Sequence, residues 1–303
     1  MLHIPDVIRR KAALVGAPTW IDSLPNLVDS LADSWGFRVE STFDDSTEAL
    51  VLAVQMSDDT PATVKIGIPR PDGDQPARES AAIRAADGHG CVRLLAESPD
   101  HHAMLLERLG APLSDLGMTT DRRQQILADA AKEFWRPALS RGFMTGAQKG
   151  RWLIESIRSE WQRSGEPCAA ATVAHAVDCA ERRIAAHDPA TAVLVHGDVH
   201  QWNTLERART DGSTEFVLID PDGLVAEPAY DLGVIMREDP SELLEGEPRE
   251  RSHRLAEQTG VPEQAIWEWG VVERVATGLV CLAVGIEEGS LMLTAADRIA
   301  ASD

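Results

Sequence analysis

The chain has 303 residues, of which 44% are hydrophobic and 26% are charged. This composition suffices for one large domain or for two lobes that each have a core. The 49 acidic and 29 basic residues give a formal net charge of -20, which argues against a nucleic-acid binder and against a protein held on anionic lipid, because both need basic surfaces. A cationic partner is compatible with this charge, and the few lysines (Lys11, Lys65, Lys132 and Lys149) stand out among the arginines.

No stretch of the sequence approaches the roughly 18 apolar residues of a membrane-spanning helix, and residues 1–11 lack the apolar core of a signal peptide. The cysteines show neither CxxC pairs nor metal-ligand spacing, so free buried thiols are predicted. We therefore expect a cytoplasmic protein.

The first third of the chain has patterns typical of strands, with one helix. The predicted order is strands over 38–43, 49–56 and 62–68, a helix over 78–86, and strands over 91–96 and 103–106.

After residue 109 the patterns become mainly helical. Helices are predicted over 122–139, 151–163 and 169–187, short strands over 191–195 and 216–219, and further helices from Asp231 through 267–286. The prediction is an α+β fold with two lobes, 1–108 and 109–303.

Residues 193–203, VLVHGDVHQWN, crowd polar side chains into the turn that follows an apolar strand. The next apolar strand, 216–219, ends at Asp220. If a hairpin joins the two strands, Asp198, Asn203 and Asp220 come together. A carboxylate base beside an amide–carboxylate pair of oxygen ligands suits Mg²⁺ and phosphate.

Two alternatives apply to the same segment. On a strand, His196, Asp198 and His200 would share a face, as the zinc ligands of a metal hydrolase do. Taken alone, Asp198 is also typical of a turn-capping residue. The spacing to Asn203 and the second acidic strand end favour the phosphate chemistry over both.

The pattern His196-x-Asp198-x-x-x-x-Asn203, followed by Asp220, resembles the catalytic and metal segments of the aminoglycoside phosphotransferases. The strings LVHGDVHQWN (194–203), LIDPDG (218–223) and EPAYDLG (227–233) resemble most closely the branch of streptomycin 6-phosphotransferases and hydroxyurea phosphotransferases. The resemblance implies a two-lobed protein-kinase-like fold. It has a small five-stranded antiparallel N-lobe with one helix, which binds nucleotide, and a larger, mainly helical C-lobe with the catalytic loop and the acceptor site.

The resemblance also implies roles for the loop residues. Asp198 would orient and deprotonate the acceptor hydroxyl, and Asn203 and Asp220 would hold Mg²⁺. His196 would brace the loop, and Asp231 would anchor it; a core or N-cap role for Asp231 is equally compatible with the sequence.

In the N-lobe, Lys65 on the third strand would position the phosphates of ATP or GTP, paired with Glu79 on the helix. The alternatives are a surface lysine and an acid placed by the helix dipole. The loop 43–48 lacks the glycines of a protein-kinase phosphate loop. Ser46 and Thr47 would therefore contact the phosphates.

The acids at positions 44, 45 and 48 of that loop should point away, because they would repel nucleotide. The segment from Glu107 to Leu109 would be the hinge, which offers backbone groups to a purine.

The acceptor substrate is the part of the function that the sequence determines least. Carboxylates on the C-terminal helices would bind guanidinium or ammonium groups by charge-assisted hydrogen bonds, and His200 either approaches the substrate or packs. The candidate acceptor-binding residues are His200, Trp269, Glu273, Glu287 and Glu288, although a tryptophan here is more often core.

The predicted function is ATP- (or GTP-) and Mg²⁺-dependent phosphorylation of a hydroxyl on a cationic, streptomycin-like aminoglycoside, which gives resistance. The alternatives are a kinase for hydroxyurea or for a small metabolite such as an amino alcohol or sugar, and a nucleotide-binding pseudokinase.

Overall fold

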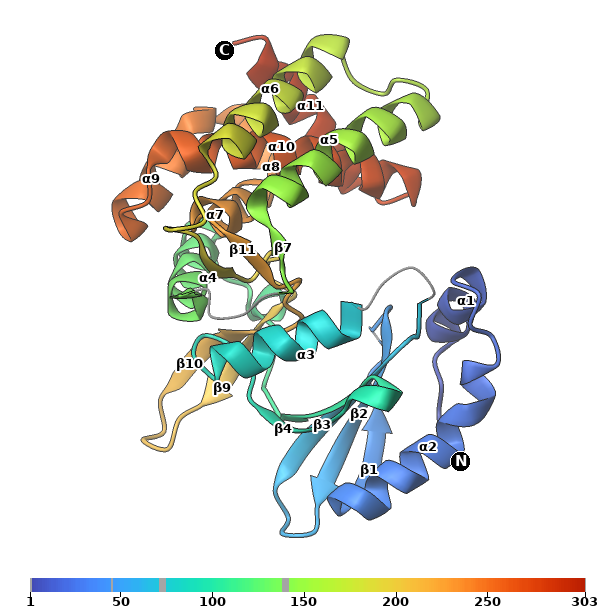
Figure 1. The fold of residues 1–303 in the computed structure, drawn as a ribbon. Helices are drawn as coiled ribbons and strands as arrows, with labels where there is room; N and C mark the ends of the chain where they lie inside the picture. Colours follow the sequence, from blue (N-terminus) through green and yellow to red (C-terminus); the bar gives the residue numbers. More distant parts are fainter. Residues whose placement is uncertain (1, 45, 71–74, 138–141, 303) are drawn as a thin grey trace. The chain divides into compact units, whose positions relative to one another are not determined.

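The computed structural model describes residues 2–44, 46–70, 75–137 and 142–302. The chain divides into two compact units, Met1–Gly110 and Ala111–Asp303; the boundary expected from the sequence lay after residue 108. Figure 1 labels most of the helices and strands of both units. All four cysteines are free, as predicted, and three of them are buried.

The smaller unit contains the predicted five-stranded antiparallel sheet, in the order β1-β2-β3-β5-β4. The fourth strand begins three residues later than predicted, because Cys91 to Arg93 lie outside the β4–β5 ladder. The strands are β1 (Phe37–Thr42), β2 (Ala49–Met56), β3 (Pro61–Gly67), β4 (Leu94–Ser98) and β5 (Ala103–Glu107).

The prediction of one helix in this unit is wrong, because its described residues form three α-helices: α1 (Asp6–Leu14), α2 (Trp20–Trp35) and α3 (Gln75–Ala86). The spacing of Ile21, Leu24, Val28 and Leu31 places one apolar face of α2 in the core. Pro25 interrupts this pattern in the sequence, but the helix continues through it.

Strand alternation places Lys65 opposite the core of the smaller unit. On β3, Val64 and Ile66 lie in the core cluster with α1 and α2. Since neighbouring side chains of a strand point to opposite faces, Lys65 points to the other face of the sheet, where it meets Glu79 of α3.

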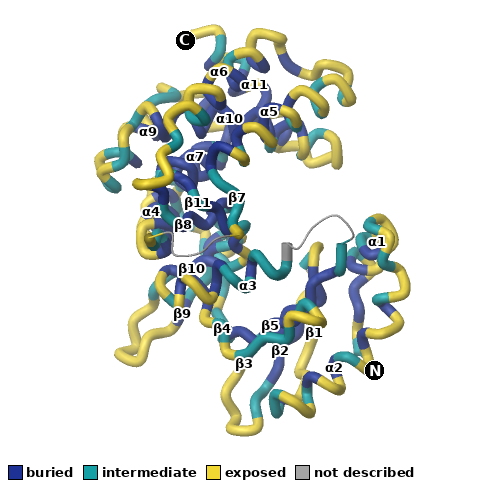
Figure 2. The backbone as a smooth tube through the Cα atoms, in the orientation of Figure 1, coloured by how far each residue is buried: buried dark blue, intermediate teal, exposed yellow. Residues whose placement is uncertain are grey.

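The larger unit is mainly helical, as predicted. The helix expected over 122–139 ends at Phe134, and Leu139 lies outside the described residues. In Figure 2, α7 and much of α10 are buried. The helices are α4 (Thr120–Phe134), α5 (Gly146–Arg163), α6 (Ala170–Ala186), α7 (Ala229–Met236), α8 (Pro240–Glu245), α9 (Pro248–Thr259), α10 (Glu263–Ala283) and α11 (Glu288–Ala300). Within the described ranges, no helix combines the length and apolarity needed to cross a membrane.

The predicted hairpin between strands 191–195 and 216–219 is wrong, because the two strands belong to different sheets. An unpredicted strand, β9, precedes β10 and forms the hairpin with it, while β8 pairs with β6 and β11. The strands are β6 (Arg136–Pro137), β7 (Met144–Thr145), β8 (Val193–Val195), β9 (Thr204–Ala208), β10 (Thr214–Leu218) and β11 (Leu224–Ala226).

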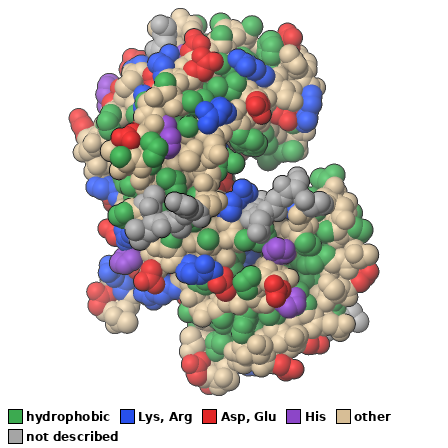
Figure 3. Space-filling view, viewed as in Figure 1, with side chains coloured by type: hydrophobic (Ala, Val, Ile, Leu, Met, Phe, Trp, Pro, Cys, Tyr) green, Lys and Arg blue, Asp and Glu red, His purple; other side chains and the backbone are tan. Residues whose placement is uncertain are grey.

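Charged side chains of both signs lie interspersed over the face drawn in Figure 3. Ion pairs join some of them, such as the exposed Arg163 with the half-buried Glu160 at 2.9 Å. Such pairs near the surface contribute little to stability.

Arg274 on α10 is a fully buried cation. Its Nη2 donates to the carbonyl of Met236 at 2.8 Å, but Nε and Nη1 have no hydrogen-bond partner among the described residues. Burial, and secondly the charge of Arg251, lower the pKa of Arg274 to about 9. The buried charge of Arg274 therefore lowers the free energy of unfolding.

Replacing this buried charge with an apolar side chain of similar length should stabilise the larger unit. Arg274→Met is expected to raise the free energy of unfolding by about 1–4 kcal/mol, as measured by urea denaturation. The exposed Arg209→Met is the control and should change it by less than about 0.5 kcal/mol. A less stable Arg274→Met protein would show that the cation has a favourable partner.

Candidate active site

The loop between β8 and β9 is held at its start by a buried carboxylate. Asp231, in the first turn of α7, accepts hydrogen bonds from the backbone N–H of His196 at 3.0 Å and of Gly197 at 2.7 Å. It also accepts one from Trp135 Nε1 at 2.9 Å. Burial raises the pKa of Asp231, while the hydrogen bonds from Gly197, His196 and Trp135 lower it. Asp231 thus fixes the loop from within the core.

His196 connects the loop to the end of β10. The N–H of Asp198 donates to its Nδ1 at 3.2 Å, so Nε2 carries the hydrogen and donates to the carbonyl of Ile219 at 2.8 Å. Burial lowers the pKa of this ring and keeps it neutral. Because both nitrogens are bonded to backbone groups, His196 does not fit the role of zinc ligand in the hydrolase alternative.

Gly197 permits the tight turn before Asp198. Its φ is +93°, a conformation that L side chains rarely adopt. A Cβ at this position would also lie 2.8 Å from Cβ of Asp222. The glycine is therefore required by both conformation and space.

Asp198 carries a partly exposed carboxylate at the centre of the loop, with 34% of its side chain accessible. Its Oδ1 accepts from Arg237 Nη2 at 2.6 Å, and its Oδ2 accepts from His200 Nε2 at 3.2 Å and Asn203 Nδ2 at 3.3 Å. Burial would raise the pKa of Asp198, but the charges and hydrogen bonds of His200 and Arg237 outweigh it and hold the pKa well below its usual range. The group is an anionic hydrogen-bond acceptor.

Asn203 and Asp220 lie at the same end of the β9–β10 hairpin. Asn203 directly precedes β9, Asp220 follows β10, and the N–H of Ile219 donates to the carbonyl of Asn203 at 2.9 Å. The side-chain Nδ2 of Asn203 donates to Asp198, which leaves its amide oxygen as the atom suited to a cation. Asp220 is exposed, with φ +59°. Amide and carboxylate oxygens fit Mg²⁺.

His200 packs within the loop and contacts the carboxylate of Asp198. Its Nδ1 accepts from the N–H of Asn203 at 3.2 Å, and its ring meets that of Trp202 edge-on at 5.7 Å. Trp202 is 59% exposed and was not predicted as a site residue.

Trp269 and Glu273 do not fit the predicted contact with the acceptor. Both lie on α10 and are 1% and 3% exposed. Trp269 Nε1 donates to Glu227 at 2.9 Å, and Glu273 accepts from Tyr230 and from Arg237. The reason is that α10 packs against α7 along this face, so both side chains are internal.

Glu287 and Glu288, in contrast, are exposed where α11 begins. Burial raises the pKa of the nearby Cys281 thiol, the charge of Arg237 lowers it, and the charge of Glu288 raises it.

In the smaller unit, the predicted lysine–glutamate pair is formed. Lys65 Nζ lies 2.7 Å from Glu79 Oε1, and both residues are less than a tenth exposed. The alternative of a surface lysine therefore does not apply. The pair joins β3 to α3 and fixes one ammonium group on the sheet face away from the core.

The loop before β2 pairs its acids with bases of the same unit. His3 contacts Asp44 at 3.0 Å, and Glu48 binds Lys11 at 2.5 Å and also Arg70. Ser46 Oγ donates to the carbonyl of Ala49 at 2.7 Å, while Thr47 is exposed; Asp45 lies outside the described residues. Lys11 and Arg70 thus neutralise the charge of Glu48.

The chain segment after β5 is tied to the sheet by Arg108. Its Nε donates to the carbonyl of Ala62 at 2.9 Å. Glu107 accepts from the N–H of Arg93 at 2.7 Å, and Leu109 is half-buried. The backbone N–H of Glu107 donates to the carbonyl of Arg93 at 3.1 Å, so residues 107 and 108 tie the segment to the sheet.

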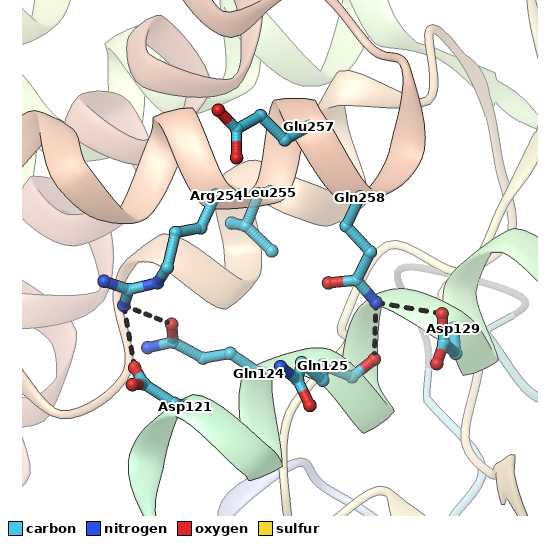
Figure 4. A pocket seen from close by; sticks show the side chains of 8 residues that line it. All are labelled: Asp121, Gln124, Gln125, Asp129, Arg254, Leu255, Glu257 and Gln258. Carbon is cyan, nitrogen blue, oxygen red and sulfur yellow. Dashed lines mark hydrogen bonds and ion pairs between the residues drawn. The ribbon is translucent and has the colours of Figure 1, made fainter.

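A polar cleft of about 550 Å³ lies between α4 and α9 (Figure 4). Its side chains bond one another: Arg254 binds Asp121 at 2.9 Å, and Gln258 binds Asp129 at 2.9 Å. No residue of the loop 196–203 lines this cleft. The loop, not the cleft, is therefore the candidate catalytic site.

Solved structures share this architecture at low sequence identity. Choline kinase from Cryptosporidium parvum gives a TM-score of 0.62 at 10% identity, with 92% of this chain and 94% of that chain covered. Macrolide 2'-phosphotransferase from Brachybacterium faecium gives 0.54 at 18% identity, with 90% and 98% covered. The fold is thus that of the protein-kinase-like phosphotransferases.

The family described as aminoglycoside/hydroxyurea antibiotic resistance kinase matches residues 35–278, and the chain belongs to it. Over 223 aligned residues, the chain is 31% identical to streptomycin 6-kinase of Streptomyces glaucescens, and the alignment covers 70% of this chain and 66% of that relative. Over 225 aligned residues, the chain is 32% identical to hydroxyurea phosphotransferase of Kitasatospora aureofaciens, and the alignment covers 70% of this chain and 61% of that relative. The match thus spans less than two thirds of either relative's length.

Proposed function

We propose that this protein is an O-phosphotransferase that uses ATP (or GTP) and Mg²⁺ to phosphorylate a hydroxyl of a small antibiotic. The observation that carries the proposal is the carboxylate of Asp198, which is anionic, partly exposed and flanked by Asn203. Its loop is fixed by Asp231. Direct transfer to the acceptor needs an oriented base of this kind and no covalent protein intermediate.

Each residue has one task in this reaction. Asp198 accepts the hydrogen bond of the acceptor hydroxyl and takes its proton as transfer proceeds. Asn203, through its amide oxygen, and Asp220 would hold Mg²⁺, which would supply positive charge to the phosphoryl group when bound. Lys65, oriented by Glu79, binds the phosphates of the nucleotide.

The acceptor that we favour is a cationic aminoglycoside such as streptomycin, and the role is then detoxification in the cytoplasm. Relatives of this chain carry the name streptomycin 6-kinase. Exposed Glu287 and Glu288 offer carboxylates for ammonium or guanidinium groups. Hydroxyurea is the second candidate, because the hydroxyurea phosphotransferase matches at a similar identity.

An ATP-consumption screen tests this proposal. The purified protein is mixed with MgATP and, one at a time, with streptomycin, other aminoglycosides, hydroxyurea and small amino alcohols. We expect streptomycin to stimulate consumption. Stimulation by hydroxyurea alone would select the second candidate, and nucleotide binding without stimulation by any acceptor would indicate a pseudokinase and contradict the proposal.

Lys65→Met should weaken the use of ATP. Removing one charged donor to phosphate costs about 1.5–3 kcal/mol, so kcat/KM for ATP is expected to fall by about 10- to 150-fold. Lys132→Met, on α4 and bonded to the carbonyl of Gln258, is the matched control. An unchanged kcat/KM in the Lys65 variant, measured at saturating acceptor, would exclude a nucleotide role for Lys65.

A further inference from the structure

Helix α7 holds the catalytic loop at two points. At its start, Asp231 accepts the loop N–H groups of His196 and Gly197. At its end, Arg237 is the C-cap residue, and its guanidinium binds the side chain of Asp198 at 2.6 Å. One contact fixes the backbone of the loop, and the other fixes the carboxylate itself.

Arg237 is in turn held by α10. Its Nη1 donates to Glu273 Oε2 at 3.0 Å and to Thr277 Oγ1 at 3.1 Å. The other oxygen of Glu273 accepts from the hydroxyl of Tyr230, which is 1% exposed. The guanidinium therefore has a buried anionic support on one side and Asp198 on the other.

The two helices touch closely enough to make this support rigid. At Gly233 of α7, a Cβ would lie 2.3 Å from Cβ of Trp269 on α10, so α7 lies directly on α10. Arg237 follows one turn later on the same helix. Its position is thus set by helix packing rather than by the loop.

The two oxygens of Asp198 are not equivalent. Oδ1 has one short charge-assisted bond, at 2.6 Å, to Arg237. Oδ2 has two longer bonds, at 3.2 Å from His200 and 3.3 Å from Asn203. Because short ionic hydrogen bonds are the stronger ones, an incoming hydroxyl displaces partners from Oδ2 far more easily than from Oδ1.

We infer that Arg237 is a positioning residue that fixes Oδ1 of Asp198 and so presents Oδ2 to the acceptor hydroxyl, with Glu273 and Thr277 fixing Arg237. This inference rests on the proposed function. It assigns Glu273 a supporting place behind the base, in contrast to the acceptor contact expected from the sequence. The side chain that orients the base comes from a different element than the loop that carries it.

The first test compares Arg237→Met and Arg237→Ala with the wild-type protein. Loss of a charged hydrogen bond predicts a fall in kcat of about 10- to 150-fold for both, with KM for ATP changed by less than about 3-fold because no phosphate contact is lost. Added methylguanidine should restore part of kcat to Arg237→Ala, which leaves a cavity, and none to Arg237→Met, which fills it.

The second test is milder and remains informative if the Arg237 variants fold poorly. Glu273→Gln keeps the shape of the side chain, and we expect kcat to fall by about 3- to 10-fold. Glu268→Gln is the matched control, since Glu268 is also a buried carboxylate on α10 but pairs with Arg182 and Arg183. Its kcat should equal that of the wild-type protein.

Two results would overturn the inference. One is an Arg237→Met protein that keeps the wild-type kcat, and the other is an equal loss of kcat in Glu273→Gln and Glu268→Gln. Both results can be measured only if the wild-type protein phosphorylates its acceptor. A wild-type protein without any phosphotransfer would first refute the proposed function, and the inference would fall with it.

Discussion

Asp198→Asn is expected to lower kcat for phosphotransfer by about 10²- to 10⁴-fold, the contribution typical of a positioned general base. The substitution keeps the size of the side chain, but an amide does not take up the hydroxyl proton. It also replaces the anion that Arg237 and His200 surround. The nucleotide should still bind, because Asp198 is not among the residues proposed to contact it.

The measurement is steady-state kinetics at saturating acceptor, together with nucleotide affinity by titration calorimetry. Asp211→Asn is the matched control, since Asp211 is an exposed aspartate in the β9–β10 turn that caps Ser213. An Asp198→Asn protein with kcat within about threefold of the wild-type value would remove Asp198 from the role of base.

Asp231→Ala is expected to lower the free energy of unfolding by about 3–5 kcal/mol, the usual cost of breaking a buried charged network. Three donors lose their acceptor at once: the N–H groups of His196 and Gly197 and the indole of Trp135. Since these groups lie in the interior, water does not replace the lost bonds without opening the structure.

Urea denaturation followed by circular dichroism measures this effect. Asp231→Asn, which retains one acceptor oxygen, should lie between the wild-type protein and Asp231→Ala. An Asp231→Ala protein within about 0.5 kcal/mol of the wild-type value would mean that the loop is held in another way.

Local patterns explain why much of the site could be predicted from the sequence. Asp198 and Asp220 follow strand ends, Asn203 directly precedes β9, and the β9–β10 ladder brings Asn203 and Asp220 together. The pair of Lys65 and Glu79 required only that β3 and α3 meet. In these cases the chemistry is encoded in residues that are near in sequence or in adjacent elements.

The role of Arg237 could not be predicted, because nothing around this arginine distinguishes it from the many others in the chain. Its contact with Asp198 depends on how the end of α7 lies against the loop. The sequence-based prediction assigned Glu273 to the acceptor site because the sequence of α10 does not show which of its faces α7 covers. The contacts of Arg237 and Glu273 are therefore determined by helix packing and not by the local sequence pattern.

In the smaller unit, α2 was not predicted, although the spacing of its apolar residues is helical and the helix continues through Pro25. Tertiary packing of Leu24 and Val28 in the core outweighs the missing backbone donor of the proline. The hairpin partner of β10 was misassigned because β9, with the sequence TLERA, shows neither a regular alternation of apolar and polar residues nor an alternating burial pattern.

The most direct test of this account follows the γ-phosphoryl group. The protein is incubated with Mg²⁺, γ-labelled ATP and streptomycin, and the products are separated and identified by mass spectrometry. The account predicts label on the streptomycin as a single phosphoryl ester, and none when Asp198→Asn replaces the wild-type protein. Label that stays on ATP or appears only as inorganic phosphate, with streptomycin and with each acceptor of the screen, would contradict it.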